Sequence, residues 1–219
     1  MRIQQLLSIH FPYLQSTDKI SFATQQFSIS KTNVLPVLQD NIFKGLISEL
    51  DILKASRTEI VASLSNLFIP LFAHPNDHFT RAIKLMSDAS LDIVPVVDEK
   101  NEWIGAITTK NLITQIAQYL DVSQPGGIIV LQLDRINYAF SELSHLVEAS
   151  NAFITQLNTH FDQASGLLNV TIKINKIEIS EVVNTLQRHA YSVKYYFGEE
   201  LYNNDLQDNY NHLMNYLNV

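Results

Sequence analysis

GLISELDIL (residues 45–53) returns later in the chain as GAITTKNLI (residues 105–113). Both copies run Gly, two small or aliphatic residues, a hydroxyl residue, two variable positions, an Asp or Asn and two aliphatic residues. This pattern is typical of a buried strand that ends where a helix begins. The repeat raises one question: is the phrase a helix cap, or does it mark two ligand sites of which one has changed?

The repeat extends upstream of these phrases. NVLPV (33–37) and IVPVV (93–97) bring Pro36 into line with Pro95, and STDKISFA (16–23) aligns with PNDHFTRA (75–82). Each copy predicts a helix, two short strands and a second helix. Two copies are too few for a solenoid, so they indicate two similar subdomains related by a pseudo-twofold axis. We expect strands at 34–38, 43–47, 93–97 and 103–107, with Asp18 and Asp77 opening the first helix of each copy.

The pattern changes after SQPGG (123–127), which is typical of a turn between domains. The remainder predicts the order βαββαβ, which makes a four-stranded antiparallel sheet with two helices on one face. Its expected strands are 128–133, 152–157, 169–174 and 192–197, and its helices are 136–147 and 178–190. We therefore expect repeats at 1–60 and 61–122, this domain at 125–200, and an amphipathic helix within 201–219.

Composition excludes several classes of function. The chain has 219 residues, a net charge of −7 and no Cys, so thiolate metal sites and cysteine nucleophiles are impossible. Its Lys and Arg residues are scattered, which argues against nucleic-acid binding. The start lacks the apolar core of a signal peptide, and no apolar run is long enough to cross a membrane. We expect a cytoplasmic protein, and the low charged fraction of 17% favours a homodimer.

Two longer segments carry a family resemblance. LPVLQDNIFKGLISELDIL and VPVVDEKNEWIGAITTKNLI resemble the paired CBS domain, whose hallmark is an aliphatic–Pro–Val strand, a turn and a Gly–aliphatic–aliphatic–Ser/Thr–x–x–Asp segment. This resemblance covers residues 1 to about 120. The rest, by its order of elements, resembles an ACT domain. The combination is similar to bacterial CBS-pair proteins of the acetoin-utilisation type, and it implies an α+β fold in which a tandem CBS pair precedes a ferredoxin-like, ACT-like domain.

The resemblance implies a regulatory module without catalysis or a required cofactor. CBS pairs bind adenosine nucleotides such as AMP, ADP, ATP or S-adenosylmethionine between the two copies. The Asp of the phrase takes the ribose hydroxyls, the Ser or Thr holds the ribose or a phosphate, and backbone near the Pro reads adenine. An unknown protein partner would receive the signal. The residues implied are Val34, Leu35, Pro36, Ser48 and Asp51 in the first copy, and Ile93, Val94, Pro95, Thr108, Lys110 and Asn111 in the second.

Two interpretations of the phrase stay open. Ser48 and Asp51 fit a capping box, which stabilises a helix without any ligand, as well as they fit a ribose site. Asn111 stands where the pattern has Asp, and it brings no charge and one acceptor fewer. Lys110 supplies a base in the second copy, where the first copy has Leu50. Either the two clefts are unequal or neither binds a ligand.

Other candidate sites are weaker. His74 and His78 have a spacing that can chelate a metal, with Asp77 beside them, but Pro75 places His74 before the helix and we expect no metal. The loop DRINYAF (134–140) lacks the Gly that amino-acid-binding ACT domains carry, so we expect a docking or dimerising domain. No nucleophile elbow, phosphate loop or dinucleotide fingerprint is present in the sequence, which favours a sensor over an enzyme. The alternative function is a ligand-free scaffolding dimer.

Overall fold

The computed structural model describes residues 1–198, and the helix expected within 201–219 lies outside them. The chain divides into two compact units, Met1–Tyr119 and a second that begins at Leu120, and each is described by itself. Within residues 1–198, no helix combines the length and the apolar character that crossing a membrane requires.

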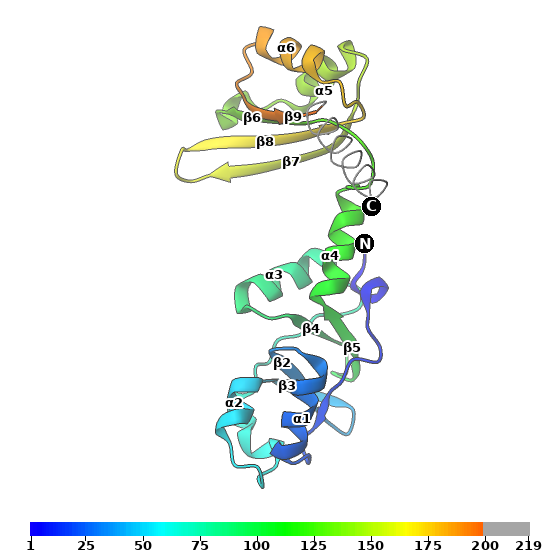
Figure 1. Cartoon of the computed structure of the whole chain (residues 1–219), viewed down its shortest axis with the longest axis vertical. Helices are drawn as coiled ribbons and strands as arrows, with labels where there is room; N and C mark the ends of the chain where they lie inside the picture. Colours follow the sequence, from blue (N-terminus) through cyan, green and yellow to red (C-terminus); the bar gives the residue numbers. More distant parts are fainter. Residues whose placement is uncertain (199–219) are drawn as a thin grey trace, which may run out of the picture. The chain divides into compact units, whose positions relative to one another are not determined.

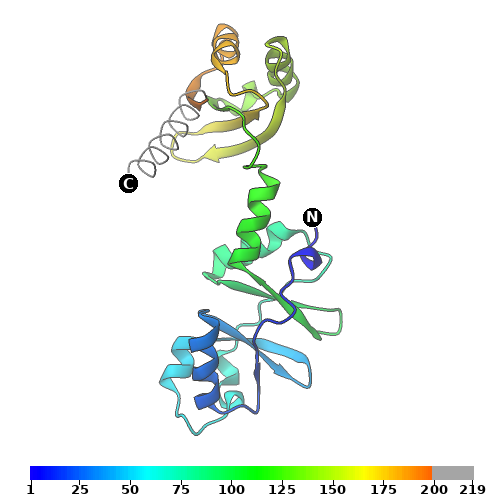
Figure 2. The same ribbon diagram turned by 45° about the vertical axis from the view of Figure 1, so that its right-hand side comes forward.

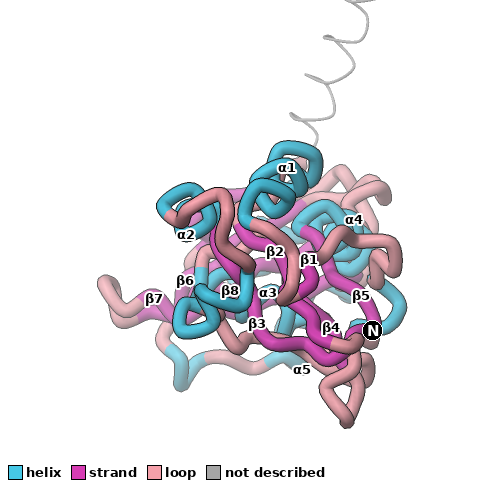
Figure 3. The backbone as a smooth tube through the Cα atoms, turned by 90° about the horizontal axis from the view of Figure 1, so that it is seen from below, coloured by secondary structure: helices cyan, strands magenta, loops and turns pink. Residues whose placement is uncertain are grey.

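The first half of the first unit follows the predicted order of helix, strand, strand and helix. These elements are α1 (Ile20–Ser30), β2 (Val34–Gln39), β3 (Ile42–Ser48) and α2 (Glu49–Lys54). A short strand, β1 (Leu14–Gln15), runs parallel to β2. Figure 3 shows α1 and α2 on the same side of β2 and β3. Because Phe27, Leu35 and Ile52 all lie in one buried cluster, the two helices cover the face of the strands that carries Leu35.

The second half repeats this arrangement with α3 (Phe79–Ala89), β4 (Ile93–Val97), β5 (Trp103–Thr108) and α4 (Thr109–Tyr119). Its core gathers Phe79, Val94 and Ile107 with further aliphatic residues. The two halves meet through a third apolar cluster that contains Val34 of β2 and Ile93 of β4. The expectation of two similar subdomains is therefore confirmed.

One detail of the prediction is wrong, because Asp18 and Asp77 do not begin the helices. The helices start at Ile20 and Phe79, and the side chains of the preceding residues, Lys19 and His78, make no capping hydrogen bond. The Asp18 carboxylate instead accepts the backbone N–H of Gln15 at 2.7 Å, and Asp77 accepts that of His74 at 2.9 Å. A short carboxylate can close a local turn as readily as it can cap a helix. Both acids therefore fix the turn that leads into a helix.

The two halves exchange short segments, which the repeat did not predict. The turn η1 (Ile3–Leu6) precedes the first copy in sequence, yet Ile3 and Leu6 lie in the core of the second half. The turn η2 (Val61–Leu67) follows the first copy, and Val61 lies in the core of the first half. The two exchanged segments are held by equivalent hydrogen bonds. The Ile3 N–H donates to the backbone carbonyl of Asp77, and the Val61 N–H donates to the backbone carbonyl of Asp18, both at 2.9 Å. Figure 2 shows the N-terminal segment, in dark blue, passing from the second half to the first.

The exchange explains why each phrase opens with glycine. Phe68 and Ile69 cross beside β3 in the first half, and Ser8 crosses beside β5 in the second. A Cβ at Gly45 would lie 2.7 Å from Cβ of Phe68, and one at Gly105 would lie 2.9 Å from the carbonyl oxygen of Ser8. Both glycines also have φ values, +149° and +159°, that side chains rarely adopt. Only glycine leaves room for the crossing segment.

The second unit has the expected ferredoxin-like fold. Its elements are β6 (Ile128–Leu133), η3 (Arg135–Asn137), α5 (Phe140–Ala149), β7 (Ile154–Asp162), β8 (Leu167–Ile174), α6 (Ser180–Arg188) and β9 (Val193–Phe197). The strands pair antiparallel in the order β7-β8-β6-β9, and Figure 1 shows α5 and α6 on one face of the sheet. The alternating side chains of β8 place Val170, Ile172 and Ile174 in the core beneath these helices. The helix expected from residue 136 begins only at Phe140, because residues 135–137 form a 3₁₀ turn.

Candidate functional site

Ser48 and Asp51 lie together where β3 passes into α2. The Ser48 hydroxyl oxygen accepts the backbone N–H of Asp51 at 3.1 Å, so Ser48 is the N-cap of the helix. The same hydroxyl donates to Oδ2 of Asp51 at 2.6 Å. Within residues 1–198, Oδ1 of Asp51 has no hydrogen-bond partner, and the side chain is only partly buried. The cap is therefore real, and it leaves one carboxylate oxygen open to a ligand.

Thr108 and Asn111 form the matching pair where β5 passes into α4, but their surroundings differ. The Thr108 hydroxyl accepts the backbone N–H of Asn111 at 3.2 Å and donates to Oδ1 of Asn111. The Asn111 amide nitrogen donates to the carbonyl oxygen of Leu6 at 3.0 Å. A carboxylate has no proton to donate at neutral pH, so Asp could not make this bond. Asn at this position ties the N-terminal segment to α4.

We predict that Asn111→Asp destabilises the protein. The substitution restores the residue that the repeat has at position 51, but it sets a carboxylate against the Leu6 carbonyl and removes its donor. Leaving such an acceptor unpaired lowers the free energy of unfolding by about 1–3 kcal/mol. Urea unfolding measures the change.

The reverse exchange, Asp51→Asn, is the matched control, because Asp51 makes no such bond to the crossing segment of its own half. We expect it to change the free energy of unfolding by less than about 1 kcal/mol. Equal stability of Asn111→Asp and the unmodified chain would contradict the role given to Asn111.

The strand residues expected in the site reach it only through their backbone. Val34 pairs with Ser48 across β2 and β3, and Ile93 pairs with Thr108 across β4 and β5. The first residue of β2 therefore lies beside Ser48, and the first residue of β4 lies beside Thr108. The side chains of these and the neighbouring strand residues are buried, so only main-chain groups could read a base. The buried set is Val34, Leu35, Pro36, Ile93, Val94 and Pro95. Lys110 is exposed in the first turn of α4.

Asn33 and Asp92 also belong to this region, although the repeat did not single them out. The backbone N–H of Asn33 donates to Oδ2 of Asp92 at 2.8 Å, which links the two halves. The Asn33 carbonyl accepts the N–H of Glu49 at the start of α2, and the Asp92 carbonyl accepts that of Thr109 at the start of α4, both at 3.0 Å. One hydrogen bond thus connects the starts of the two helices. The signal in the sequence was their shared position just before each Pro-containing strand.

Asp92 carries an electrostatic penalty at this junction. Its Oδ1 is buried without a hydrogen-bond partner within the described chain. Burial raises the pKa of Asp92 above the ordinary carboxyl value, against the lowering effect of the hydrogen bond from Asn33. The folded state therefore binds a proton on the Asp92 carboxyl more tightly than the unfolded state does. Protonation of Asp92 thus contributes to stability; this contribution is fully present below the unfolded pKa and is lost as pH rises through the folded pKa.

We predict that the unmodified chain gains stability relative to Asp92→Asn as pH falls from 7 toward 4, the ordinary carboxyl range. Asp162→Asn is a control of opposite sign. The Ser165 hydroxyl and the Ala164 N–H lower the pKa of Asp162, so the unmodified chain should lose stability relative to that variant as pH falls below about 4. Urea unfolding from pH 7 to about pH 3 measures both differences. If the difference in free energy of unfolding between the unmodified chain and Asp92→Asn does not change with pH, the pKa of Asp92 is the same in the folded and unfolded states and the prediction is wrong.

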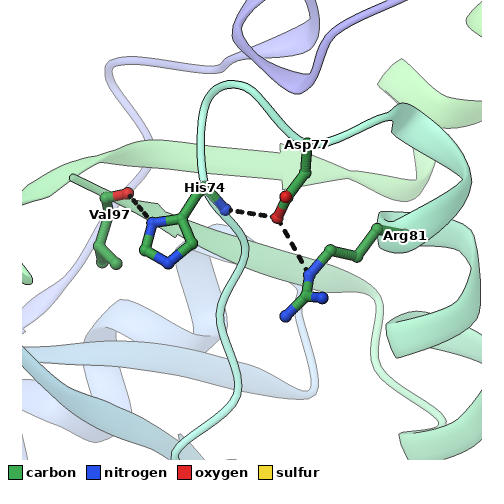
Figure 4. A network of polar contacts seen from close by, with 4 residues as sticks. All are labelled: His74, Asp77, Arg81 and Val97. Carbon is green, nitrogen blue, oxygen red and sulfur yellow. Dashed lines mark hydrogen bonds and ion pairs between the residues drawn. The ribbon is translucent and has the colours of Figure 1, made fainter. Parts of the chain in front are cut away.

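The residues weighed as metal ligands have local structural partners. Figure 4 shows the Asp77 carboxylate between the backbone N–H of His74 and the guanidinium of Arg81, whose Nε lies 3.0 Å from Oδ2. Nδ1 of His74 lies 3.1 Å from the Val97 carbonyl, and Nδ1 of His78 lies 2.9 Å from the Thr80 hydroxyl. These contacts are those of a turn followed by the start of a helix.

Comparisons with known proteins agree with this architecture. A model of the CBS domain family matches residues 69–118, and a search of curated proteins gave no significant match. The solved structures that resemble the chain include a CBS domain pair/ACT domain protein from Thermotoga maritima, with 20% identity, a TM-score of 0.50, and coverage of 55% of this chain and 99% of that one. The CBS domains of a transcriptional regulator from Streptococcus pneumoniae have 13% identity, a TM-score of 0.47, and coverage of 52% and 98%. CBSX2 in complex with AMP has 20% identity, a TM-score of 0.47, and coverage of 54% and 98%.

At these identities the likeness to the Thermotoga maritima protein shows the fold alone. The closer resemblance to proteins of acetoin utilisation stays a prediction. The family model covers the second half of the first unit, and the first half repeats its elements in the same order. The fold is therefore that of a CBS domain pair followed by a ferredoxin-like α+β domain.

Proposed function

We propose that this chain is a cytoplasmic, non-catalytic regulatory protein that binds one adenosine nucleotide at the start of α2 and passes the signal to a protein partner. The observation that carries the proposal is the difference between Asp51 and Asn111. Both polar atoms of the Asn111 side chain bond to the protein, whereas Asp51 keeps one oxygen without a partner in the described chain. The first half thus offers a ligand position that the second half uses for its own structure.

Asp51 is suited to a ribose. A ribose diol presents two O–H donors, and an ionised carboxylate only accepts, so the two are complementary. Donation to a charged acceptor is stronger than between neutral groups. The strand backbone near Pro36 would read the base, because the side chains there are buried.

The charge around α2 favours ligands with little negative charge. The first turn of α2 carries Glu49 and Asp51, and the Lys of the repeat stands at 110 in the other half. These two carboxylates repel phosphate at short range. Each added phosphate therefore increases a repulsion that opposes the attraction of the helix N-terminus for an anion. We therefore propose AMP or S-adenosylmethionine ahead of ADP and ATP at this site.

The junction between the halves supplies a route for the signal. A ligand at the start of α2 lies next to Glu49, whose backbone N–H donates a hydrogen bond to the Asn33 carbonyl. The backbone N–H of Asn33 in turn donates to the carboxylate of Asp92 in the other half. A ligand can shift the arrangement of the halves only if it binds one arrangement more tightly. Asp92 is partly buried with one carboxylate oxygen unpaired in residues 1–198, so its contact with Asn33 is costly to maintain. This contact is therefore a suitable place for two arrangements of the halves to differ.

Titration calorimetry of the full chain with AMP and with S-adenosylmethionine tests the proposal. We expect saturable binding of at least one of them, with one site per chain, because Asp51 keeps a carboxylate oxygen without a partner in residues 1–198, whereas both polar atoms of the matching Asn111 side chain are bonded to the protein. Two sites per chain would contradict the unequal roles of Asp51 and Asn111. Light scattering of the same sample at micromolar concentration tests the proposed homodimer, and a monomer mass would exclude it.

The alternative is a ligand-free dimer that scaffolds another protein. The hydrogen bond between Ser48 and Asp51 favours it, because the two side chains already satisfy each other in part. The absence of any heat with AMP, S-adenosylmethionine, ADP or ATP, in a sample that light scattering shows to be dimeric, would support this alternative.

A further inference from the structure

The second unit contains a cleft on the face of its sheet opposite α5 and α6, with a volume of about 430 Å³. Small-molecule sites in proteins have volumes of this order. Its floor comes from β6, β7, β8 and the end of β9, and its wall comes from the segment between Leu120 and Gly126. The described residues that line it are Leu120, Val122, Gln124, Pro125, Gly126, Ile128, Gln156, Asn158, Thr171, Lys173, Ile177, Phe197 and Gly198.

The floor follows from the alternation of β8. Val170, Ile172 and Ile174 face the helices, so Thr171 and Lys173 face the cleft. Antiparallel pairing places Asn158 opposite Thr171 and Ile128 opposite Lys173. The floor therefore combines polar groups from β7 and β8 with an apolar side chain from β6.

The wall is held in place by the fold. The backbone carbonyl of Gly127 accepts the N–H of Ile174 at 2.9 Å, and a Cβ at Gly126 would lie 2.2 Å from the Ile174 carbonyl oxygen. The ammonium of Lys173 donates to the carbonyl of Asp121. The segment is thus fastened to β8 at both ends, and the cleft exists before any ligand binds.

The lining defines the chemistry of a ligand. Among the lining residues that the structure describes, Lys173 alone carries a charge, and its ammonium keeps two donors beyond the one given to Asp121. Leu120, Ile128 and Phe197 offer apolar contact. We propose that this cleft binds a small organic monocarboxylate with an apolar body, its carboxylate on Lys173. This proposal is independent of the nucleotide site.

The same lining argues against free amino acids. No lining residue in the described chain has a carboxylate, so the ammonium of an α-amino acid would lie in the cleft without a charged partner. The cleft is also separate from the loop 134–140, whose residues do not line it. A monocarboxylate would share Lys173 with the Asp121 carbonyl, so its binding acts directly on the segment that follows α4.

The test is a titration of the ¹⁵N-labelled full chain with 3-phenylpropionate, followed by amide chemical shifts. Two ligand controls have the same ring, namely 3-phenylpropionamide without the charge and phenylalanine with an added ammonium. We expect saturable shifts at Ile128, Thr171 and Lys173 with the acid, and binding weaker by about tenfold or more with either control, since a charge-assisted hydrogen bond contributes at least that much.

Three variants locate the site. Lys173→Met keeps the aliphatic stem and should weaken binding of 3-phenylpropionate about tenfold to a hundredfold. Lys194→Met removes the same charge from an exposed position on β9 that does not line the cleft, and it should leave the affinity unchanged. Thr171→Tyr fills the cleft and should abolish binding. No saturable shifts with 3-phenylpropionate, equal binding of its amide, or unaltered binding by Lys173→Met or by a folded Thr171→Tyr chain would each overturn the proposal.

Discussion

Gly45→Ala is expected to lower the free energy of unfolding by about 2–6 kcal/mol. The new Cβ would lie 2.7 Å from Cβ of Phe68, which the main chain holds in place, so the crossing segment must move. The backbone at φ +149° adds strain for any residue with a side chain. Strain of this kind contributes about 1–3 kcal/mol, and forcing extra atoms into a packed region contributes about the same again. Urea unfolding of the full chain measures the change.

Gly105→Ala should behave in the same way, because its Cβ would lie 2.9 Å from the Ser8 carbonyl oxygen. Gly166→Ala is the matched control. Gly166 also has a positive φ, +69°, but its Cβ would meet no atom within 4 Å, so only the backbone effect of about 1 kcal/mol remains. If Gly45→Ala and Gly166→Ala cost the same, the exchange of segments does not explain the glycine of the repeated phrase.

The second large effect is expected at Asp51. Asp51→Ala should weaken binding of the preferred nucleotide about tenfold to a hundredfold, because a hydrogen bond to a charged group contributes roughly 1.5–3 kcal/mol. Asp51→Asn keeps one acceptor and loses the charge, so its affinity should fall between those of the unmodified chain and Asp51→Ala. Calorimetry with the nucleotide that the unmodified chain binds best measures both. Unchanged affinity in Asp51→Ala would remove Asp51 from the site.

The order of elements could be predicted from the sequence because it depends on local patterns. The two copies of the repeat have the same sequence of helix and strand signals, and β8 alternates apolar and polar residues from Leu168 to Ile174. The boundary of α5 was less accessible, because residues 135–137 have a helical pattern but turn as a 3₁₀ segment. A periodicity of side chains does not distinguish these two kinds of turn.

The exchange of η1 and η2 could not be predicted, because it depends on contacts between distant parts of the chain. Nothing local to Ile3 indicates that it packs beside Phe79, and nothing local to Asn111 indicates that Leu6 lies within hydrogen-bond distance. For this reason the sequence alone indicated that Asn111 was a weakened ligand residue. Its hydrogen bond to the Leu6 carbonyl gives a structural reason for Asn, in place of the Asp of the first copy, at this position. Asp92 was missed for the same reason, since its partner Asn33 lies in the other half.

The melting temperature of the unmodified chain and of Asp51→Ala, each with and without AMP and S-adenosylmethionine, tests the central claim most directly. At a hundredfold excess over Kd, a ligand stabilises the folded state by about 2.7 kcal/mol. We predict that the unmodified chain melts higher with at least one of these ligands and that Asp51→Ala loses this shift. The mutant should otherwise melt close to the unmodified chain, since the change at the helix terminus lowers stability by at most ~1 kcal/mol. If Asp51→Ala melts lower while the unmodified chain responds to neither ligand, then Ser48 and Asp51 are a helix cap and the proposed site is wrong.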